Sequence, residues 1–311
     1  MLLELIDKTN KPDLNRLQSY QKGLENLLKK CDRLHGIKNS YIYYQLSLQR
    51  KEDLLSQIAL KTFELGNYFF QQKEIEQYIC DYIRNLLDAP CDLETLHLDS
   101  LAVLQSIEAN GLLVKAKKNY SFCDRRFHQY YVAREIITSP DPQTLEKYLQ
   151  NLVNHINNIR WREVFLLVVG MLPNSDYLLK LIKHQTDALV ASDEKLQTFL
   201  AKNYQKSNSG IPYKPAAFRA ISIAFVLNID PDARNLDTHL AYDLSFKPAF
   251  VRNTHIKNCH FSKQQKQVLK QYYDANKLLW DCLVCAHYVS RTVREELEKT
   301  LLVNTAHAGV F

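Results

Sequence analysis

The scarcity of glycine limits this chain more than any other feature of its sequence. Only seven of the 311 residues are glycine, and the two closest, Gly23 and Gly36, lie 13 positions apart. Loops that hold phosphate need two or three glycines within about six residues, because bare backbone must approach the anion. The chain has no such cluster, which excludes Walker-type NTPases, Rossmann dehydrogenases and the glycine loop of kinases. What remains is mostly helical.

The composition is that of a folded protein. Hydrophobic residues make up 46% and charged residues 24% of the chain, so disorder is not expected. A length of 311 residues predicts about two domains. The net charge of +6 is mild, and a solvated surface explains it without any nucleic-acid partner.

The cysteines and the N-terminus predict a cytoplasmic location. The seven cysteines are an odd number and are scattered, and the first residues include Glu4 and Asp7, which a secretory signal would not tolerate. The longest uncharged apolar run, residues 164–172, is far shorter than the roughly 20 residues of a membrane span. We expect a soluble, intracellular chain with reduced thiols and no membrane contact.

Helical periodicity dominates the chain. Asp141 and Pro142 combine an N-cap with proline at the first helical position, and Ser262 and Gln265 have the spacing of a capping box. Asp193, after Ser192, is expected to open another helix rather than to form a nuclease site. Helices are predicted at about 14–31, 53–65 (ended by Gly66), 73–86, 142–156, 159–172, 174–190, 193–206, 215–228, 262–286 and 290–302.

Residues 97–123 have a different pattern. Asp99 or Ser100 is expected to cap a helix that stops at Asn110 and Gly111. Two short β-type runs, 112–116 and 120–122, then flank a polar turn and predict a hairpin. A helix, a hairpin with a basic tip and another helix form the outline of a winged helix. The predicted fold is therefore mainly α: a helical bundle or array with a small winged-helix β-hairpin.

One cluster has the residue types of a tetrahedral zinc site. It combines a CxxC pair with a second cysteine and two histidines: Cys259, His260, Cys282, Cys285 and His287. The alternative is that Cys282 and Cys285 are core residues on one face of a leucine-rich helix, since buried cysteine is common in cores. We favour the core interpretation and expect no metal and no other cofactor.

A second cluster mixes basic and aromatic residues. Its cations could contact phosphates if they lie on a winged helix: Lys115, Lys117, Lys118, Arg125 and Arg126. However, Phe127, Tyr130 and Tyr131 follow at helical spacing and predict a buried stripe before a base-stacking surface. Nucleic-acid binding is therefore the second functional hypothesis.

At this point the sequence resembles a known family. Residues 120–136, YSFCDRRFHQYYVAREI, look like the aromatic signature that closes the winged-helix domain of bacterial NACHT-type STAND NTPases, relatives of the NLR immune receptors. Further segments resemble the end of the NTPase core or the helical domain after the winged helix: 46–59, 160–167, 189–195, 212–217, 261–267 and 271–279. The likeness covers nearly the whole chain.

The resemblance implies a division of the chain. It implies a helical leader at 1–56 similar to the end of a NACHT core, a winged-helix-like domain at 57–138 and a C-terminal helical domain at 139–311. The Walker lysine, the Walker acids and the sensor segment have no counterpart. Family members commonly place a nucleotide-contacting histidine where this sequence has Asp124. A carboxylate would repel a diphosphate, so weakened nucleotide locking is expected.

These expectations add up to a non-catalytic protein. The resemblance implies a regulatory or protein-interaction module of a NACHT/STAND signalling or defence system that lacks its own nucleotide-binding core. The expected partner is a protein, either a separate NACHT core chain or another copy. The candidate contact residues are Trp161, Arg162 and the basic cluster, namely Lys115, Lys117, Lys118, Arg125 and Arg126. Trp161 fits a core position equally well.

Overall fold

The computed structural model describes residue 23 and residues 46–86, 93–138, 141–208, 215–228 and 260–304. Within these ranges the chain forms eleven α-helices and one small antiparallel sheet, which confirms the predicted mainly helical class. No helix in this part is long and apolar enough to cross a membrane. The predicted helix at 14–31 lies outside the described residues except for Gly23, which is helical.

The described residues divide into two compact units. The first contains the residues up to Tyr148 together with Glu163–Met171, and the second contains Leu149–Arg162 and the residues from Leu172 onward. The predicted boundary between residues 56 and 57 falls within a helix of the first unit. The three-domain division otherwise stays a prediction.

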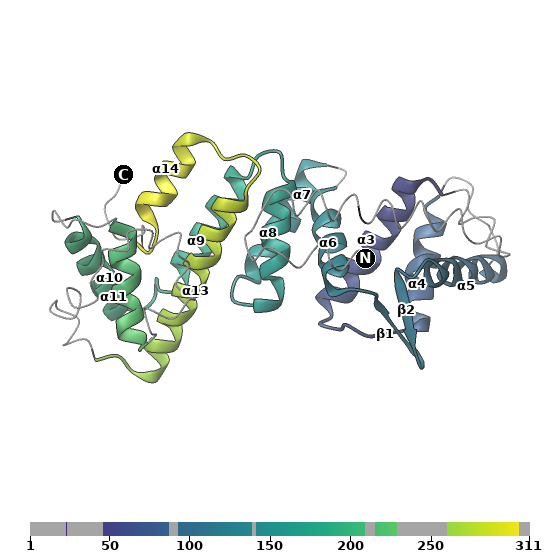
Figure 1. Ribbon diagram of the computed structural model, residues 1–311, viewed down its shortest axis with the longest axis horizontal. Coiled ribbons are helices and arrows are strands. Elements are labelled where there is room, and N and C mark those ends of the chain that lie inside the picture. Colours follow the sequence, from purple (N-terminus) through teal and green to yellow (C-terminus); the bar gives the residue numbers. More distant parts are fainter. Residues whose placement is uncertain are drawn as a thin grey trace. The chain divides into compact units, whose positions relative to one another are not determined.

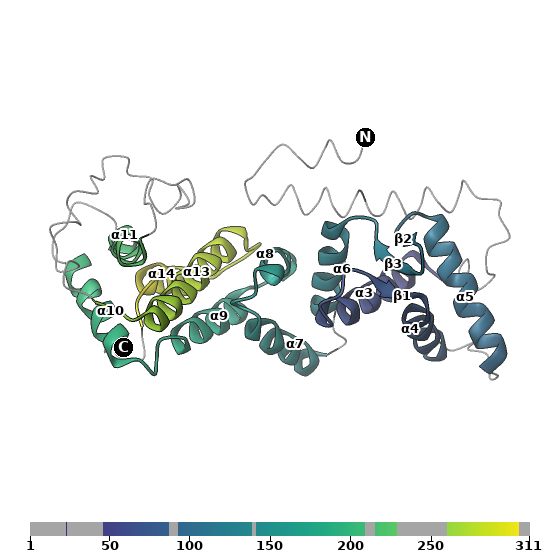
Figure 2. The same cartoon turned by 90° about the horizontal axis from the view of Figure 1, so that it is seen from below.

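The first unit combines helices with the sheet (Figure 1). The strands follow the order β1–β3–β2, so β3 is central and both pairings are antiparallel. Figure 2 shows this sheet next to the helices of the unit. Its elements up to residue 137 are α3 (Leu48–Glu64), β1 (Phe70–Gln71), α4 (Gln72–Arg84), α5 (Leu93–Ala109), β2 (Leu113–Ala116), β3 (Asn119–Phe122) and α6 (Arg125–Ile137).

The sheet agrees with the sequence in part. The hairpin is confirmed, and Lys117 at its turn has a φ of 59°, a left-handed conformation that such tight turns require. Strand β1 was not predicted. Its Phe70 is only 2% exposed and lies opposite Tyr120 of β3. A two-residue strand is too short for alternation to reveal it, and the pairing depends on a partner about 50 residues away.

The predicted start of α5 is wrong. The helix begins at Leu93, so Asp99 and Ser100 lie inside it, and the Ser100 hydroxyl donates to the His97 carbonyl at 2.8 Å. Burial of Leu96 (2% exposed) extends the helix upstream of both polar residues. The end of α3 is as expected, because Gly66 follows it with a φ of 81°.

Helices α3 and α6 are joined by a buried histidine. The Nε2 atom of His128 lies 3.0 Å from the Ala59 carbonyl oxygen and 3.0 Å from the Thr62 hydroxyl. A carbonyl oxygen can only accept, so the Nε2–H of the imidazole donates to Ala59, and the Thr62 hydroxyl, which itself donates to the Ile58 carbonyl at 2.7 Å, is a second acceptor for that hydrogen. The ring stacks on Phe122 with centroids 4.5 Å apart. This contact ties α6 to α3 and to β3.

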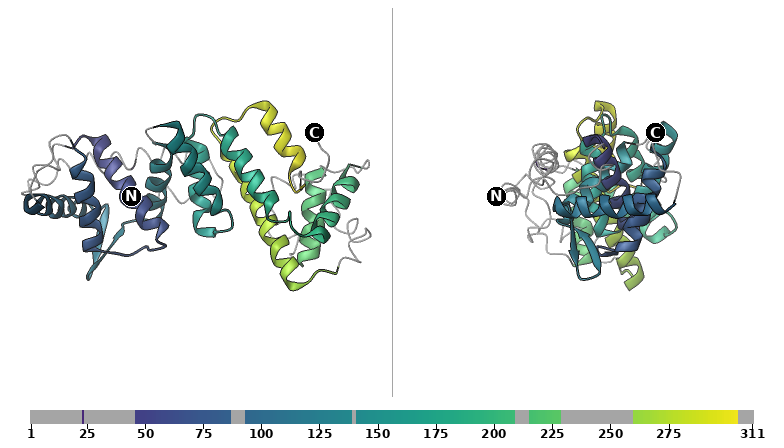
Figure 3. Two further views of the ribbon diagram at one scale, coloured as in Figure 1. Left: turned by 180° about the vertical axis from the view of Figure 1, so that it is seen from behind. Right: turned by 90° about the vertical axis from the view of Figure 1, so that its right-hand side faces the viewer.

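The remaining helices agree closely with the predicted ranges. In the second unit α9 and α13 pack side by side (Figures 1 and 3). Most of α8 belongs to the first unit, as does the start of α7. The elements are α7 (Pro142–Asn154), the 3₁₀ turn η1 (Ile159–Trp161), α8 (Arg162–Met171), α9 (Asp176–Ala188), α10 (Glu194–Ser207), α11 (Pro215–Leu227), α13 (Lys263–Cys285) and α14 (Arg291–Thr300).

Three predicted helix starts are confirmed by their hydrogen bonds. The Asp141 carboxylate accepts from the Thr144 amide at 2.9 Å, and that of Asp193 accepts from the Leu196 amide at 3.0 Å. Ser262 and Gln265 form both bonds of a capping box, each at 3.1 Å. Asp193 therefore satisfies the N-terminus of α10, as expected from the sequence.

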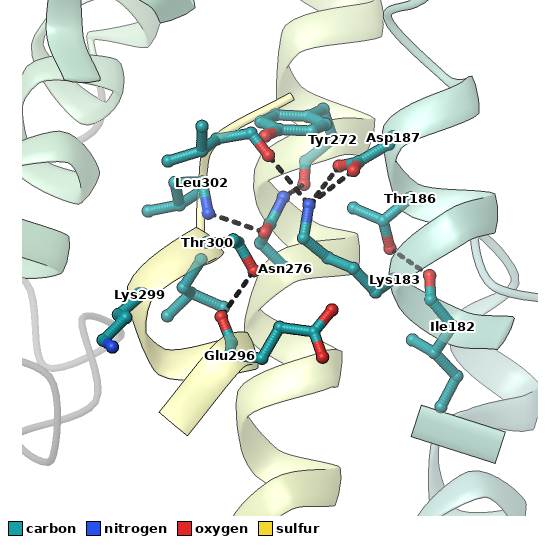
Figure 4. A network of polar contacts seen from close by, with 12 residues as sticks. Ile182, Lys183, Thr186, Asp187, Tyr272, Asn276, Glu296, Lys299, Thr300 and Leu302 are labelled. Atoms are coloured by element: carbon teal, nitrogen blue, oxygen red, sulfur yellow. Dashed lines mark hydrogen bonds and ion pairs between the residues drawn. The ribbon is translucent and has the colours of Figure 1, made fainter. Parts of the chain in front are cut away.

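A buried ion pair connects α9 to the segment after α14. Lys183 and Asp187 are 7% and 6% exposed and pair on one face of α9. The Lys183 ammonium also donates to the Val303 carbonyl at 2.8 Å. Figure 4 shows this ammonium beside the Asp187 carboxylate, and the Leu302 amide directed at Asn276 of α13. Burial lowers the pKa of Lys183, while Asp187 opposes that shift.

A second buried cation binds the end of α14. Arg219 of α11 is 1% exposed, and its guanidinium donates to the carbonyls of Leu301 at 2.8 Å and Lys299 at 3.0 Å. It also donates to the Ser207 hydroxyl at 3.1 Å. The last carbonyls of a helix lack intrahelical partners and carry partial negative charge. Burial lowers the pKa of Arg219 to about 10.

Loss of the Lys183 side chain should destabilise the second unit strongly. We expect Lys183→Ala to lower the free energy of unfolding by about 3–5 kcal/mol, because Asp187 is left as a buried charge without its cation. Lys270→Ala is the matched control, since Lys270 forms the same i,i+4 pair with Asp274 on the exposed face of α13. It should cost less than about 0.5 kcal/mol. Urea unfolding followed by circular dichroism measures both; equal losses would contradict the role of Lys183.

Candidate interaction surface

The hairpin between β2 and β3 presents three exposed lysines. Lys117 lies at the turn itself and Lys118 next to it. Lys115 already has contacts within the protein: its ammonium donates to the Gln72 side chain at 3.0 Å and lies 5.2 Å from the centroid of the Tyr120 ring. The structure thus brings the three predicted lysines together on one exposed hairpin.

Asp124 is the N-cap of α6. Its carboxylate accepts from the Arg126 amide at 2.8 Å. The same carboxylate binds the Arg126 guanidinium through Nε at 3.0 Å and Nη2 at 2.7 Å. These hydrogen bonds hold the pKa of Asp124 below its ordinary value, although partial burial opposes them. Arg126 is therefore occupied within the protein, whereas the Arg125 guanidinium lies exposed, 4.9 Å from the centroid of the Tyr68 ring.

The position of Asp124 has a consequence for anions. A helix N-terminus attracts phosphate through its free amides and its dipole. At α6 the protein's own carboxylate already binds an amide there, and Arg126 neutralises that carboxylate. A phosphate at this place would have to displace Asp124 and break its contacts. Weakened nucleotide locking stays a prediction, and this geometry agrees with it.

Trp161 and Arg162 do not form an exposed pair. The Trp161 indole is 3% exposed and stacks on His155, with ring centroids 4.2 Å apart. Of the two alternatives for Trp161, the surface contact is wrong and the core position fits, because packing buries the indole at the end of η1. Arg162 is half-exposed and forms an ion pair with Asp281 of α13. Its side chain fixes η1 to α13 within the second unit.

The cysteine and histidine cluster is only partly described, because Cys259 lies outside the described residues. Among those described, no three or more metal-ligating side chains come together. Cys282 is fully buried on α13, and burial raises the pKa of its thiol. Cys285 is half-buried, whereas His260 and His287 are exposed. For Cys282 the core interpretation fits the burial.

Three buried polar residues were missed at the sequence level: His128, Lys183 and Arg219. Arg219 carried a usable signal, because it is the only charged residue in α11, which is otherwise apolar apart from one serine. His128 lies among aromatic residues at helical spacing, which hides it in a core pattern. Lys183 and Asp187 have the spacing of an ordinary surface pair, so only the structure distinguishes them.

The C-terminal part of the chain matches a known family. Residues 243–304 match the model of NACHT C-terminal Helical domain 2. The match includes α13, α14 and the segment up to Asn304 that Lys183 and Arg219 bind. No curated protein matches the chain.

Asp124 should act mainly as a helix cap. We expect Asp124→Ala to lower the free energy of unfolding by about 1–2 kcal/mol at neutral pH, and Asp124→Ser to recover about half of that loss. Because the folded pKa of Asp124 is lowered, its contribution is present above the unfolded pKa and is lost as pH falls through the folded one. Urea titrations at pH 7 and pH 3 measure this difference. An alanine variant as stable as the wild type at pH 7 would exclude the capping role.

Proposed function

Because the chain carries a NACHT-type C-terminal helical region, we propose that it is a non-catalytic protein-interaction module of a NACHT/STAND-type signalling or defence system in the cytoplasm. The match of residues 243–304 to the NACHT C-terminal helical family carries this proposal. The buried contacts of Lys183 and Arg219 support a folded helical array around that region.

The first unit fits a winged helix. Its elements follow the order helix, strand, helix, helix, strand and strand, and the sheet order is β1–β3–β2. In this assignment α5 takes the place of the helix that precedes the wing, and the β2–β3 hairpin is the wing. Helix α6 follows the wing and contacts α3 through His128.

The sequence itself offers no nucleotide-binding core. The spacing of the glycines leaves no place for a phosphate loop in this sequence. Asp124 places a carboxylate at the N-terminus of α6, where the family resemblance leads one to expect a nucleotide-contacting histidine. Both features support a chain that binds protein rather than nucleotide and that performs no catalysis by itself.

Nucleic-acid binding is the weaker candidate. The exposed lysines of the hairpin favour it, since wings contact phosphates. Helix α5, however, contains Glu94, Asp99 and Glu108 and neither lysine nor arginine. A winged helix that reads duplex DNA inserts this helix into the major groove, where these carboxylates would be repelled by phosphates.

The direct test is co-purification with a NACHT core. We expect this chain, co-expressed with a separate NACHT core chain, to co-elute with that core in size-exclusion chromatography. Arg125→Glu should weaken the complex at least tenfold, because the Arg125 guanidinium is exposed beside the hairpin. Lys270→Glu on α13 serves as the control and should leave the complex intact. Separate elution of the two wild-type chains at micromolar concentrations would contradict the proposal.

A further inference from the structure

Helix α5 has two apolar sides, only one of which is covered. Leu96, Val103, Leu104 and Ile107 are each at most 2% exposed and face the core of the first unit. On the opposite side Leu98 is 59% exposed, and Leu101 and Ala102 are half-exposed. A solvated helix normally carries polar residues on its outer side.

The outer side forms one continuous stripe. Leu98, Leu101, Ala102, Gln105 and Ala109 follow at offsets of 3, 4, 7 and 11 residues from Leu98. Such offsets place side chains on one face of an α-helix. Gln105 is the single polar residue among them. We call these five residues the α5 stripe.

The edges of the stripe carry negative charge. By helical position Glu94 lies at the N-terminal end of the stripe, one turn before Leu98, and Glu108 lies at its edge. Helix α5 contains no lysine or arginine to balance them. Glu108 accepts a hydrogen bond from the Tyr120 hydroxyl at 2.9 Å, so its carboxylate is held in place by β3. Asp99 adds a third carboxylate to the helix. The α5 stripe is thus an apolar surface with acidic margins.

The carboxylates of α5 indicate which kind of partner can bind the α5 stripe. Nucleic acid would bring phosphates against the carboxylates. A second copy of the same face would bring two acidic margins together, which an isologous contact does not tolerate well. A helix with an apolar face and lysine or arginine along its flanks matches both the stripe and the margins.

We propose that the α5 stripe docks a cationic amphipathic helix of a partner protein. This inference rests on the proposed function as a protein-interaction module and names the chemistry of one partner. Apolar contact with Leu98 and Leu101 would provide the affinity, and the glutamates would select the basic flanks. The surface is that of a single helix, so binding should be moderate and reversible.

The test uses the full chain and two synthetic peptides of about 18 residues that form amphipathic helices. Both have leucines at i, i+3, i+4 and i+7; one has lysine at the polar positions and the other has glutamate. We expect the lysine peptide to bind with a Kd of about 10–100 µM and the glutamate peptide at least tenfold more weakly. Leu98→Lys and Leu101→Lys should each weaken binding of the lysine peptide at least tenfold.

The control variant is Val114→Lys. Val114 is 46% exposed on β2 of the same unit, and its substitution should leave peptide affinity within twofold. Circular dichroism checks the fold of each variant, and Leu98→Gln replaces Leu98→Lys if the latter unfolds. Equal binding of both peptides, binding insensitive to the leucine variants, or no binding at all would overturn the proposal.

Two further results would also overturn it. Direct binding of labelled duplex DNA to the chain that Leu98→Glu weakens would assign the surface to nucleic acid, and a dimer abolished by Leu98→Lys would assign it to a second copy. Co-elution of the wild-type chain with a NACHT core, together with failure of the lysine peptide to bind, would show that the proposed function stands while the α5 stripe fails.

Discussion

The second unit depends on hydrogen bonds to the backbone carbonyls at the end of α14. The carbonyls of Lys299, Leu301 and Val303 are bound by two buried cations, Arg219 and Lys183. Unpaired backbone carbonyls in a dry interior cost free energy, and unpaired buried cations cost more. The carbonyls and the two cations are tolerated in the interior because the cations donate hydrogen bonds to the carbonyls. Three helices thereby converge on one short segment, since Asn276 of α13 also accepts from the Leu302 amide.

This arrangement bears on the family match. The matched residues 243–304 include α13, α14 and the bound segment, but Lys183 on α9 and Arg219 on α11 lie outside them. The matched region therefore relies on side chains supplied by earlier helices. The 62 matched residues are therefore packed as part of a larger helical array and not as a free-standing piece.

Local signals in the sequence predicted much of the fold. Caps at Asp141, Asp193 and Ser262 and periodic apolar residues placed the helices within a few residues of their observed bounds. Strand β1 could not be found, because its pairing with β3 is long-range. The start of α5 was misplaced because Asp99 and Ser100 resemble caps, and only the burial of Leu96 extends the helix past them.

The candidate surface was less predictable than the fold. The sequence alone predicted that Lys115, Lys117 and Lys118 lie on one hairpin, and the structure agrees. It could not show that Arg126 is bound to Asp124, that Trp161 is buried or that Leu98 is exposed. These properties depend on which face of each element is covered, and tertiary packing decides that.

We propose that this chain contributes protein contacts and not nucleotide chemistry. The most direct measurement is isothermal titration of the purified full chain with ATP and with ADP in the presence of Mg²⁺. We expect no binding heat at millimolar nucleotide, since the sequence offers no phosphate loop and Asp124 occupies the N-terminus of α6. Saturable binding at micromolar nucleotide would contradict it.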